Sequence, residues 1–213
     1  MSFNFDAPED VNNGGGFLNE EGIFHIIVTN CREGEGNKGK PIDGFTFEFD
    51  VLAGTVENCT GKTGGQSIFS PDLSKEQSKQ DAARRKLAAF FIASSILDPN
   101  QLGQSVKIDL SGMVEKQLII KLVRQMKQDE AGNWNVPTKF LEISYSDIWH
   151  VDDPQVKDIP KNADALAMIP EEQRHDASWF DFKKKKGAGK PASNRAAKDS
   201  KESANNVDVA AMF

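Results

Sequence analysis

Apolar and polar residues alternate over several short stretches of the chain, and a period of two is typical of a half-buried β-strand. The pattern is clearest over residues 45–51, where three phenylalanines and a valine alternate with Thr, Glu and Asp. Alternation, or a high content of β-branched and aromatic residues, predicts six strands, at residues 22–31, 45–51, 67–69, 106–110, 118–127 and 139–149. We place Phe45, Phe47 and Phe49 in the core, because an aromatic stripe at strand spacing is usually buried.

The period becomes helical over residues 74–97. The positions on one helical face are Ala83, Leu87, Phe90, Phe91, Ser94 and Leu97. Ser74 followed by Gln77 three residues later is the pattern of a capping box, which predicts that the helix begins there. Pro99 lies just past the expected end, where a helix must have stopped.

Three strands, one long helix and about three further strands indicate a mainly β fold. An antiparallel barrel of five to six strands, with a helix between strands three and four, matches the oligonucleotide/oligosaccharide-binding (OB) fold. Parallel α/β folds fit badly, because they need repeated strand–helix alternation.

Composition divides the chain into three parts. We expect residues 1–19, which are polar and glycine-rich, to be a mobile lead-in, and residues 20–182 to form one OB-fold domain that binds nucleic acid. Residues 183–213 bury too little apolar surface to offset chain entropy and are expected to form a disordered, flexible tail with an apolar tip. This tail has a net charge of +5, whereas residues 1–182 have a net charge of −11.

No segment predicts export or membrane insertion. Residues 1–10 lack the apolar region of a signal peptide, and no apolar run approaches the ~20 residues that span a bilayer. We therefore expect a cytoplasmic protein without a membrane partner. Cys31 and Cys59 have no metal-like spacing, and we interpret them as reduced structural residues.

The sequence offers little that favours catalysis. Residues 56–63 (VENCTGKT) imitate a phosphate-binding P-loop, but Val56 replaces its first glycine and no helical pattern follows, so we predict a turn. A nuclease needs clustered carboxylates that hold a divalent metal, and Asp147, Asp152 and Asp153 form only a poor cluster. We expect a protein that is not an enzyme and that has no cofactor.

Five residues are candidate metal ligands: His25, His150, Asp152, Asp153 and His175. Their spacing matches no metal-ligand pattern, and the helical i, i+4 arrangement is missing. We interpret them as surface polar residues at a strand end.

Basic and aromatic residues near the predicted strand connections favour nucleic-acid binding. The candidate residues are Arg32, Lys38, Lys40, Lys121, Lys127, Trp134 and Lys139. Trp134 lies in a polar hairpin, where an exposed indole can stack on a base while lysine and arginine neutralise phosphates. The alternatives stay open: Trp134 folds back on its own hairpin, and the lysines are ordinary solvated residues.

Several segments resemble the small phage-encoded single-stranded DNA-binding proteins with an OB-type core. They are residues 1–6 (MSFNFD), 21–24 (EGIF), 47–54 (FEFDVLAG), 85–90 (RKLAAF) and 101–108 (QLGQSVKI). The resemblance covers about residues 1–125 and marks the scaffold rather than a catalytic site. It implies a non-catalytic protein of phage-type DNA replication, recombination or repair, in a bacterium or infected host cell, that binds single-stranded DNA largely without sequence specificity.

The end of the chain resembles the tips of bacterial single-stranded DNA-binding proteins, which recruit replication and repair enzymes. Here Phe213 is terminal and Met212 precedes it, but Asp208 is the one acidic residue among the last seven, where those tips carry several. The resemblance implies replication or recombination proteins as partners of Asp208, Met212 and Phe213. The alternative function is a protein-interaction module on the same barrel, and homo-oligomerisation stays open.

Overall fold

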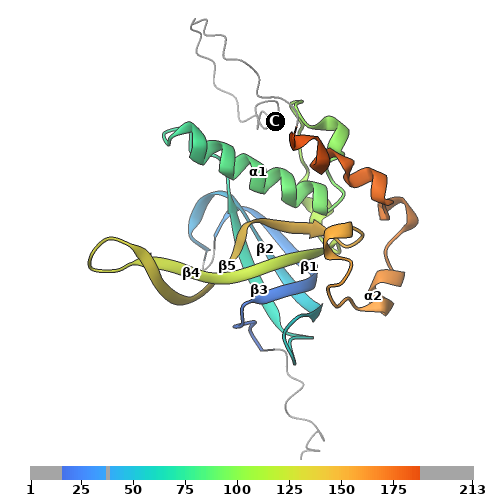
Figure 1. Ribbon diagram of the computed structural model, residues 1–213, viewed down its shortest axis with the longest axis horizontal. Coiled ribbons are helices and arrows are strands. Elements are labelled where there is room, and N and C mark those ends of the chain that lie inside the picture. Colours follow the sequence, from blue (N-terminus) through green and yellow to red (C-terminus); the bar gives the residue numbers. More distant parts are fainter. Residues whose placement is uncertain (1–15, 37–38, 188–213) are drawn as a thin grey trace, which may run out of the picture.

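The computed structural model describes residues 16–36 and 39–187 and is mainly β. Five strands form one antiparallel sheet in the order β3-β2-β1-β4-β5 (Figure 1). The strands are β1 (Gly22–Glu35), β2 (Pro41–Gly54), β3 (Thr63–Phe69), β4 (Gln117–Gln128) and β5 (Trp134–His150). Five of the six predicted strands therefore lie within observed strands.

The predicted strand at residues 106–110 is wrong. These residues are irregular and lead into a short 3-10 helix, η3 (Leu110–Met113). Val106, Ile108 and Leu110 still pack against the core as half-buried side chains. The alternating sequence pattern therefore predicted correctly that every second side chain is turned inward, but this segment does not pair with a strand.

The main core lies between the sheet and the helix α1 (Gln77–Ala93). Phe45, Phe47 and Phe49 are buried there, as predicted. The helix α1 lies across this side of the sheet (Figure 1), and its Phe90 ring packs 4.7 Å from the ring centre of Phe47. Such contacts between aromatic rings stabilise a fold beyond the area that they bury.

The helix begins later than the capping box predicted. The residue before α1 is Glu76, whose side chain makes no capping hydrogen bond. The backbone N–H and the hydroxyl of Ser74 instead donate to Oδ1 of Asp72, at 3.0 and 2.6 Å. A charged carboxylate gives a stronger hydrogen bond than the capping interaction that Ser74 would otherwise make. Asp72 therefore holds Ser74 in a turn ahead of the helix.

A second apolar cluster covers the other side of β1 and β4. Ile119, Val151 and Val156 are its buried members, and Ile23 and Leu166 pack against them. The chain after β5 makes this cover through the short helices η4 (Pro154–Val156), α2 (Ala163–Ala167) and η5 (Glu171–Gln173), before η6 (Ala177–Gly187) returns towards α1 (Figure 1).

Candidate nucleic-acid interface

The end of β4 and the beginning of β5 form a two-stranded ribbon, residues 124–141, that projects from the body at the left of Figure 1. Asp129 forms its turn, because Oδ1 accepts the backbone N–H groups of Ala131 and Asn133 at 2.9 and 2.8 Å. Gly132 lies at φ +86°, a conformation that favours glycine. The short polar sequence DEAGN therefore closes the ribbon by local hydrogen bonding.

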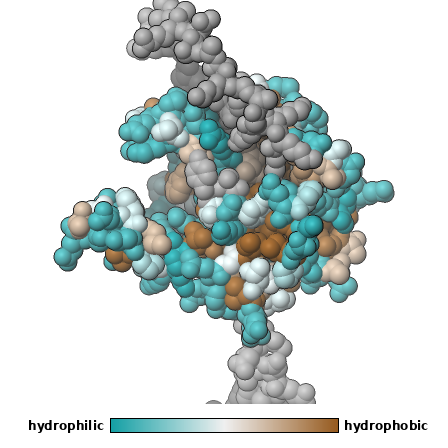
Figure 2. All heavy atoms as spheres, in the orientation of Figure 1, coloured by the Kyte–Doolittle hydropathy of each residue, from teal (hydrophilic) through white to brown (hydrophobic). Residues whose placement is uncertain are grey.

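Large apolar side chains are exposed along this ribbon. Trp134 is 69% exposed, Phe140 60% and Met126 44%. Trp134 pairs with Gln128 across the ribbon, and Met126 pairs with Pro137. The exposure of Trp134 agrees with the hypothesis that it stacks on a base, which stays a prediction. Figure 2 shows the ribbon as a mostly hydrophilic projection with a few apolar residues.

Two of the predicted lysines accompany these side chains. Lys127 is exposed and pairs with Val136 across the ribbon. The Lys139 ammonium lies 5.4 Å from the centre of the Phe140 ring. Aromatic faces beside cations are the groups that single-stranded nucleic acid contacts. Lys127, Trp134 and Lys139 thus all lie on the ribbon.

Arg124 fixes the base of the ribbon. Its Nη1 donates to the carbonyl of Lys139 at 2.8 Å and to Oδ1 of Asn19 at 3.2 Å, and its Nη2 donates to the carbonyl of Asn19. The backbone N–H of Arg124 donates to the Glu21 carboxylate at 2.5 Å. Arg124 therefore ties both ribbon strands to the chain before β1, a role that nothing in its local sequence indicated.

The other predicted cations do not form one cluster with the ribbon. Arg32 on β1 is ion-paired with Glu48 on β2 at 2.7 Å, and Lys121 with Asp147 at 3.7 Å. Both pairs are partly exposed, and their carboxylates weaken the field that a phosphate would meet. Lys40 is exposed just before β2. Lys38, like the tail residues Asp208, Met212 and Phe213, lies outside the described residues.

Side-chain hydrogen bonds join β3 to β2 and to β5. The hydroxyls of Thr46 and Ser67 share a 2.8 Å hydrogen bond across β2 and β3. Next to Ser67, the side-chain amide of Gln66 donates to the carbonyl of Leu141 on β5 at 3.2 Å. The two edge strands of the sheet therefore touch at the point where the ribbon leaves the body.

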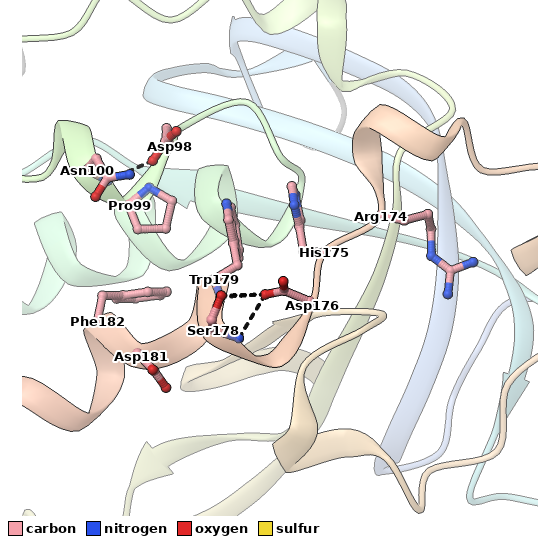
Figure 3. Close-up of a pocket in the computed structure, with 10 residues that line it drawn as sticks. All are labelled: Asp98, Pro99, Asn100, Arg174, His175, Asp176, Ser178, Trp179, Asp181 and Phe182. Atoms are coloured by element: carbon pink, nitrogen blue, oxygen red, sulfur yellow. Dashed lines mark hydrogen bonds between the residues drawn. The ribbon is translucent and has the colours of Figure 1, made fainter.

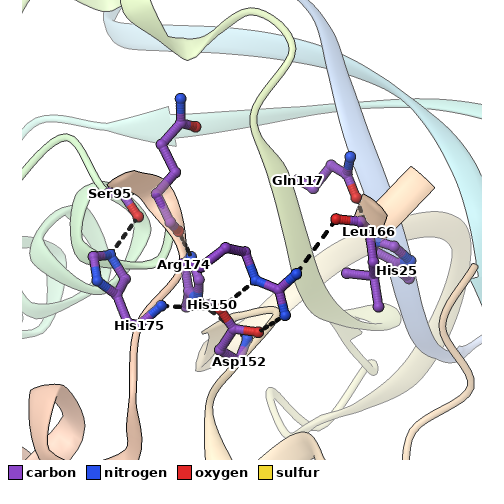
Figure 4. A network of polar contacts seen from close by, with 9 residues as sticks. His25, Ser95, Gln117, His150, Asp152, Leu166, Arg174 and His175 are labelled. Atoms are coloured by element: carbon purple, nitrogen blue, oxygen red, sulfur yellow. Dashed lines mark hydrogen bonds and ion pairs between the residues drawn. The ribbon is translucent and has the colours of Figure 1, made fainter. Parts of the chain in front are cut away.

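We expected the histidines to be surface residues at a strand end, and this prediction is wrong. His25, His150 and Asp153 are buried, and His175 is half-buried (Figure 4). His25 Nδ1 accepts the backbone N–H of Asn162 at 3.2 Å. Each histidine binds a segment that is distant in sequence, so these contacts could not be predicted from the residues near it. Within residues 16–36 and 39–187, no group of three or more His, Cys, Asp or Glu side chains is arranged to hold a metal ion.

Burial sets the protonation of these histidines. It lowers the pKa of His25 to about 4, a shift that the Gln117 hydrogen bond opposes. It also lowers the pKa of His150 to about 4, against the attraction of the Asp152 carboxylate. His150 Nδ1 accepts the N–H of Asp152 at 3.1 Å, and its Nε2 lies 3.0 Å from the Gln173 carbonyl. Both rings are therefore neutral structural groups that hold the C-terminal cover in place.

No protein-family model matches the chain, and no curated protein matches its sequence. Every helix in the described part of the chain is too short or too polar to cross a bilayer.

Proposed function

We propose that this protein binds single-stranded DNA without catalysing a reaction, and that the β4–β5 ribbon is its main contact surface. The observation that carries the proposal is the ribbon itself, where exposed Trp134 and Phe140 lie among Lys127 and Lys139. Large exposed apolar side chains gathered on a projecting element are typical of a contact surface. Bases stack on such rings, and each stacked base contributes about 1–3 kcal/mol.

The strand order supports an OB-type barrel as the scaffold. The edges β3 and β5 are those that would pair to close the sheet, and the Gln66–Leu141 hydrogen bond bridges them. OB folds bind oligonucleotides on the face of strands two and three and through the β1–β2 and β4–β5 connections. Arg32 and Lys40 flank the first of these connections here, and the ribbon is the second.

The charges favour weak binding with a shallow dependence on salt. Glu48 and Asp147 already pair with Arg32 and Lys121, and the chain has a net charge of −6. Few cations remain to neutralise phosphates, so stacking would supply most of the affinity. A role in phage-type replication, recombination or repair, with replication or recombination proteins as tail partners, remains part of this proposal.

Fluorescence anisotropy tests the proposal with a labelled single strand of about 30 nucleotides, which covers several OB-fold footprints. A duplex of equal length is the comparison, and both are titrated at low and physiological salt. We expect binding to the single strand, weakened by salt, with the strand left intact when magnesium is added. Equal binding to both DNAs would contradict the preference for single strands, and no binding at either salt would contradict the proposal and favour the protein-interaction module.

A further inference from the structure

A cavity of about 490 Å³ lies between the turn after α1 and η6, the last described helix. One wall is η2 (Pro99–Gln101) with its capping residue Asp98, and the other is the beginning of η6. Its volume is in the range of small-ligand sites. No candidate residue for DNA binding lines this cavity.

An indole forms the centre of the cavity wall. His175 stacks on one face of Trp179, with ring centres 3.9 Å apart and planes within 1°. Pro99 and Phe182 lie on the other side of the indole (Figure 3), and the Phe182 ring stands at 87° to it. The indole face turned away from His175 is therefore the one that a flat ligand in the cavity would meet.

Carboxylates surround this indole. Asp98, Asp176 and Asp181 all line the cavity. Oδ1 of Asp98 accepts the N–H of Asn100 at 2.8 Å, and Oδ1 of Asp176 accepts the N–H of Ser178 at 2.9 Å. Hydrogen bonds from Ser178 lower the pKa of Asp176. Because these bonds use Oδ1, Oδ2 of Asp98 and of Asp176 can accept from a ligand.

The cationic side chain at the cavity does not offset these charges. Arg174 binds both oxygens of Asp152, at 2.6 and 2.8 Å, and Figure 3 shows its guanidinium directed away from the other lining residues. His175 shares a 2.9 Å hydrogen bond with Ser95, and burial lowers its pKa, which favours the neutral ring. The described lining of the cavity therefore presents three carboxylates and an aromatic wall.

We propose that this cavity binds an arginine side chain of a partner polypeptide. The guanidinium would lie on the Trp179 face that Pro99 and Phe182 flank and donate to Asp98, while Asp176, on the His175 side of the indole (Figure 3), adds to the negative charge. A planar guanidinium stacks on indole and pairs with carboxylates at the same time, which an ammonium group does less well. None of the candidate DNA-binding residues lines the cavity, so this site is separate from the proposed DNA contact and does not depend on it.

The test is NMR of the full chain, with the indole N–H of Trp179 as the reporter, assigned through Trp179→Phe. The probe is N-acetyl-arginine amide, and the matched control is the citrulline analogue, which has the same shape without charge. We expect a saturable shift with a Kd of about 1 mM, the scale of a single side chain, and at least about tenfold weaker binding of citrulline. The lysine analogue should bind more weakly than arginine.

Charge-removing variants connect the shift to the cavity. Asparagine keeps the oxygen that accepts the backbone N–H, so Asp98→Asn with Asp176→Asn should fold normally and bind arginine about tenfold more weakly. Asp129→Asn, at the ribbon turn, is the matched control and should bind normally. The proposal is overturned if arginine leaves the Trp179 signal unmoved, if citrulline or lysine binds equally well, or if the double variant binds like the native chain.

Discussion

The side-chain amide of Gln66 on β3 donates a 3.2 Å hydrogen bond to the carbonyl of Leu141 on β5, so one polar contact links the two edges of the sheet. An unpaired edge exposes backbone groups that invite association with other chains. The contact also lies at the base of the ribbon, where it connects the stability of the body to the position of Trp134.

Replacing Gln66 by Ala should lower the free energy of unfolding by about 1 kcal/mol, the usual contribution of one hydrogen bond. Urea denaturation measures the change. Gln125→Ala, at an exposed position of β4, is the control and should stay within about 0.5 kcal/mol of the native chain. Equal midpoints for the two variants would show that the edge contact does not stabilise the fold.

Trp134→Ala should weaken single-strand binding by about tenfold, because one stacked base contributes about 1–3 kcal/mol. Its unfolding midpoint should change little, since the indole is 69% exposed. Anisotropy and thermal unfolding measure the two effects. Met168→Ala removes an equally exposed apolar side chain next to α2 and should bind normally. Native affinity in the Trp134 variant would exclude that residue from the site.

Arg124→Lys should loosen the ribbon, because an ammonium cannot reach the Asn19 and Lys139 oxygens together. Amide hydrogen exchange at residues 126–139 should become faster, with little change in the core strands. The same substitution at Arg85, which is exposed on α1, is the control. If exchange in the ribbon is unchanged, Arg124 does not position it.

Phe47 and Phe90 should couple in a double-mutant cycle. Each change to Ala should cost about 3–5 kcal/mol, so Leu is the safer replacement in a fold of ordinary stability. We expect a coupling energy of about 0.5–1.5 kcal/mol in denaturant unfolding of Phe47→Leu, Phe90→Leu and the pair. Strict additivity would mean that the two rings do not stabilise each other.

Stability should fall between about pH 6.5 and pH 4. His25 and His150 have a pKa of about 4 in the folded protein, against 6.5 for the free side chain. In this window the unfolded chain binds protons that the folded chain does not, so the free energy of unfolding rises with pH. Urea midpoints at pH 7 and pH 5 measure the slope.

His25→Gln supplies the control for that slope. Glutamine stays neutral while it can still accept from Asn162 and donate to Gln117, the two partners of His25. The variant should therefore lose less stability on acidification than the native chain. An unchanged slope would place the pH dependence elsewhere, for example in the Asp152–Arg174 ion pair.

Local sequence predicted five of the six expected strands, the buried stripe of Phe45, Phe47 and Phe49 and the polar hairpin with Trp134, because side-chain alternation and turn chemistry act between near neighbours. Tertiary structure alone decided which charges and polar groups meet. Arg32 is neutralised by Glu48, 16 residues away on the next strand, and His25 binds Asn162, 137 residues away. Neither partner leaves a local signal, because pairing across strands follows from the register of the whole sheet. For the same reason the cavity around Trp179 exists only once η2 and η6 have packed together.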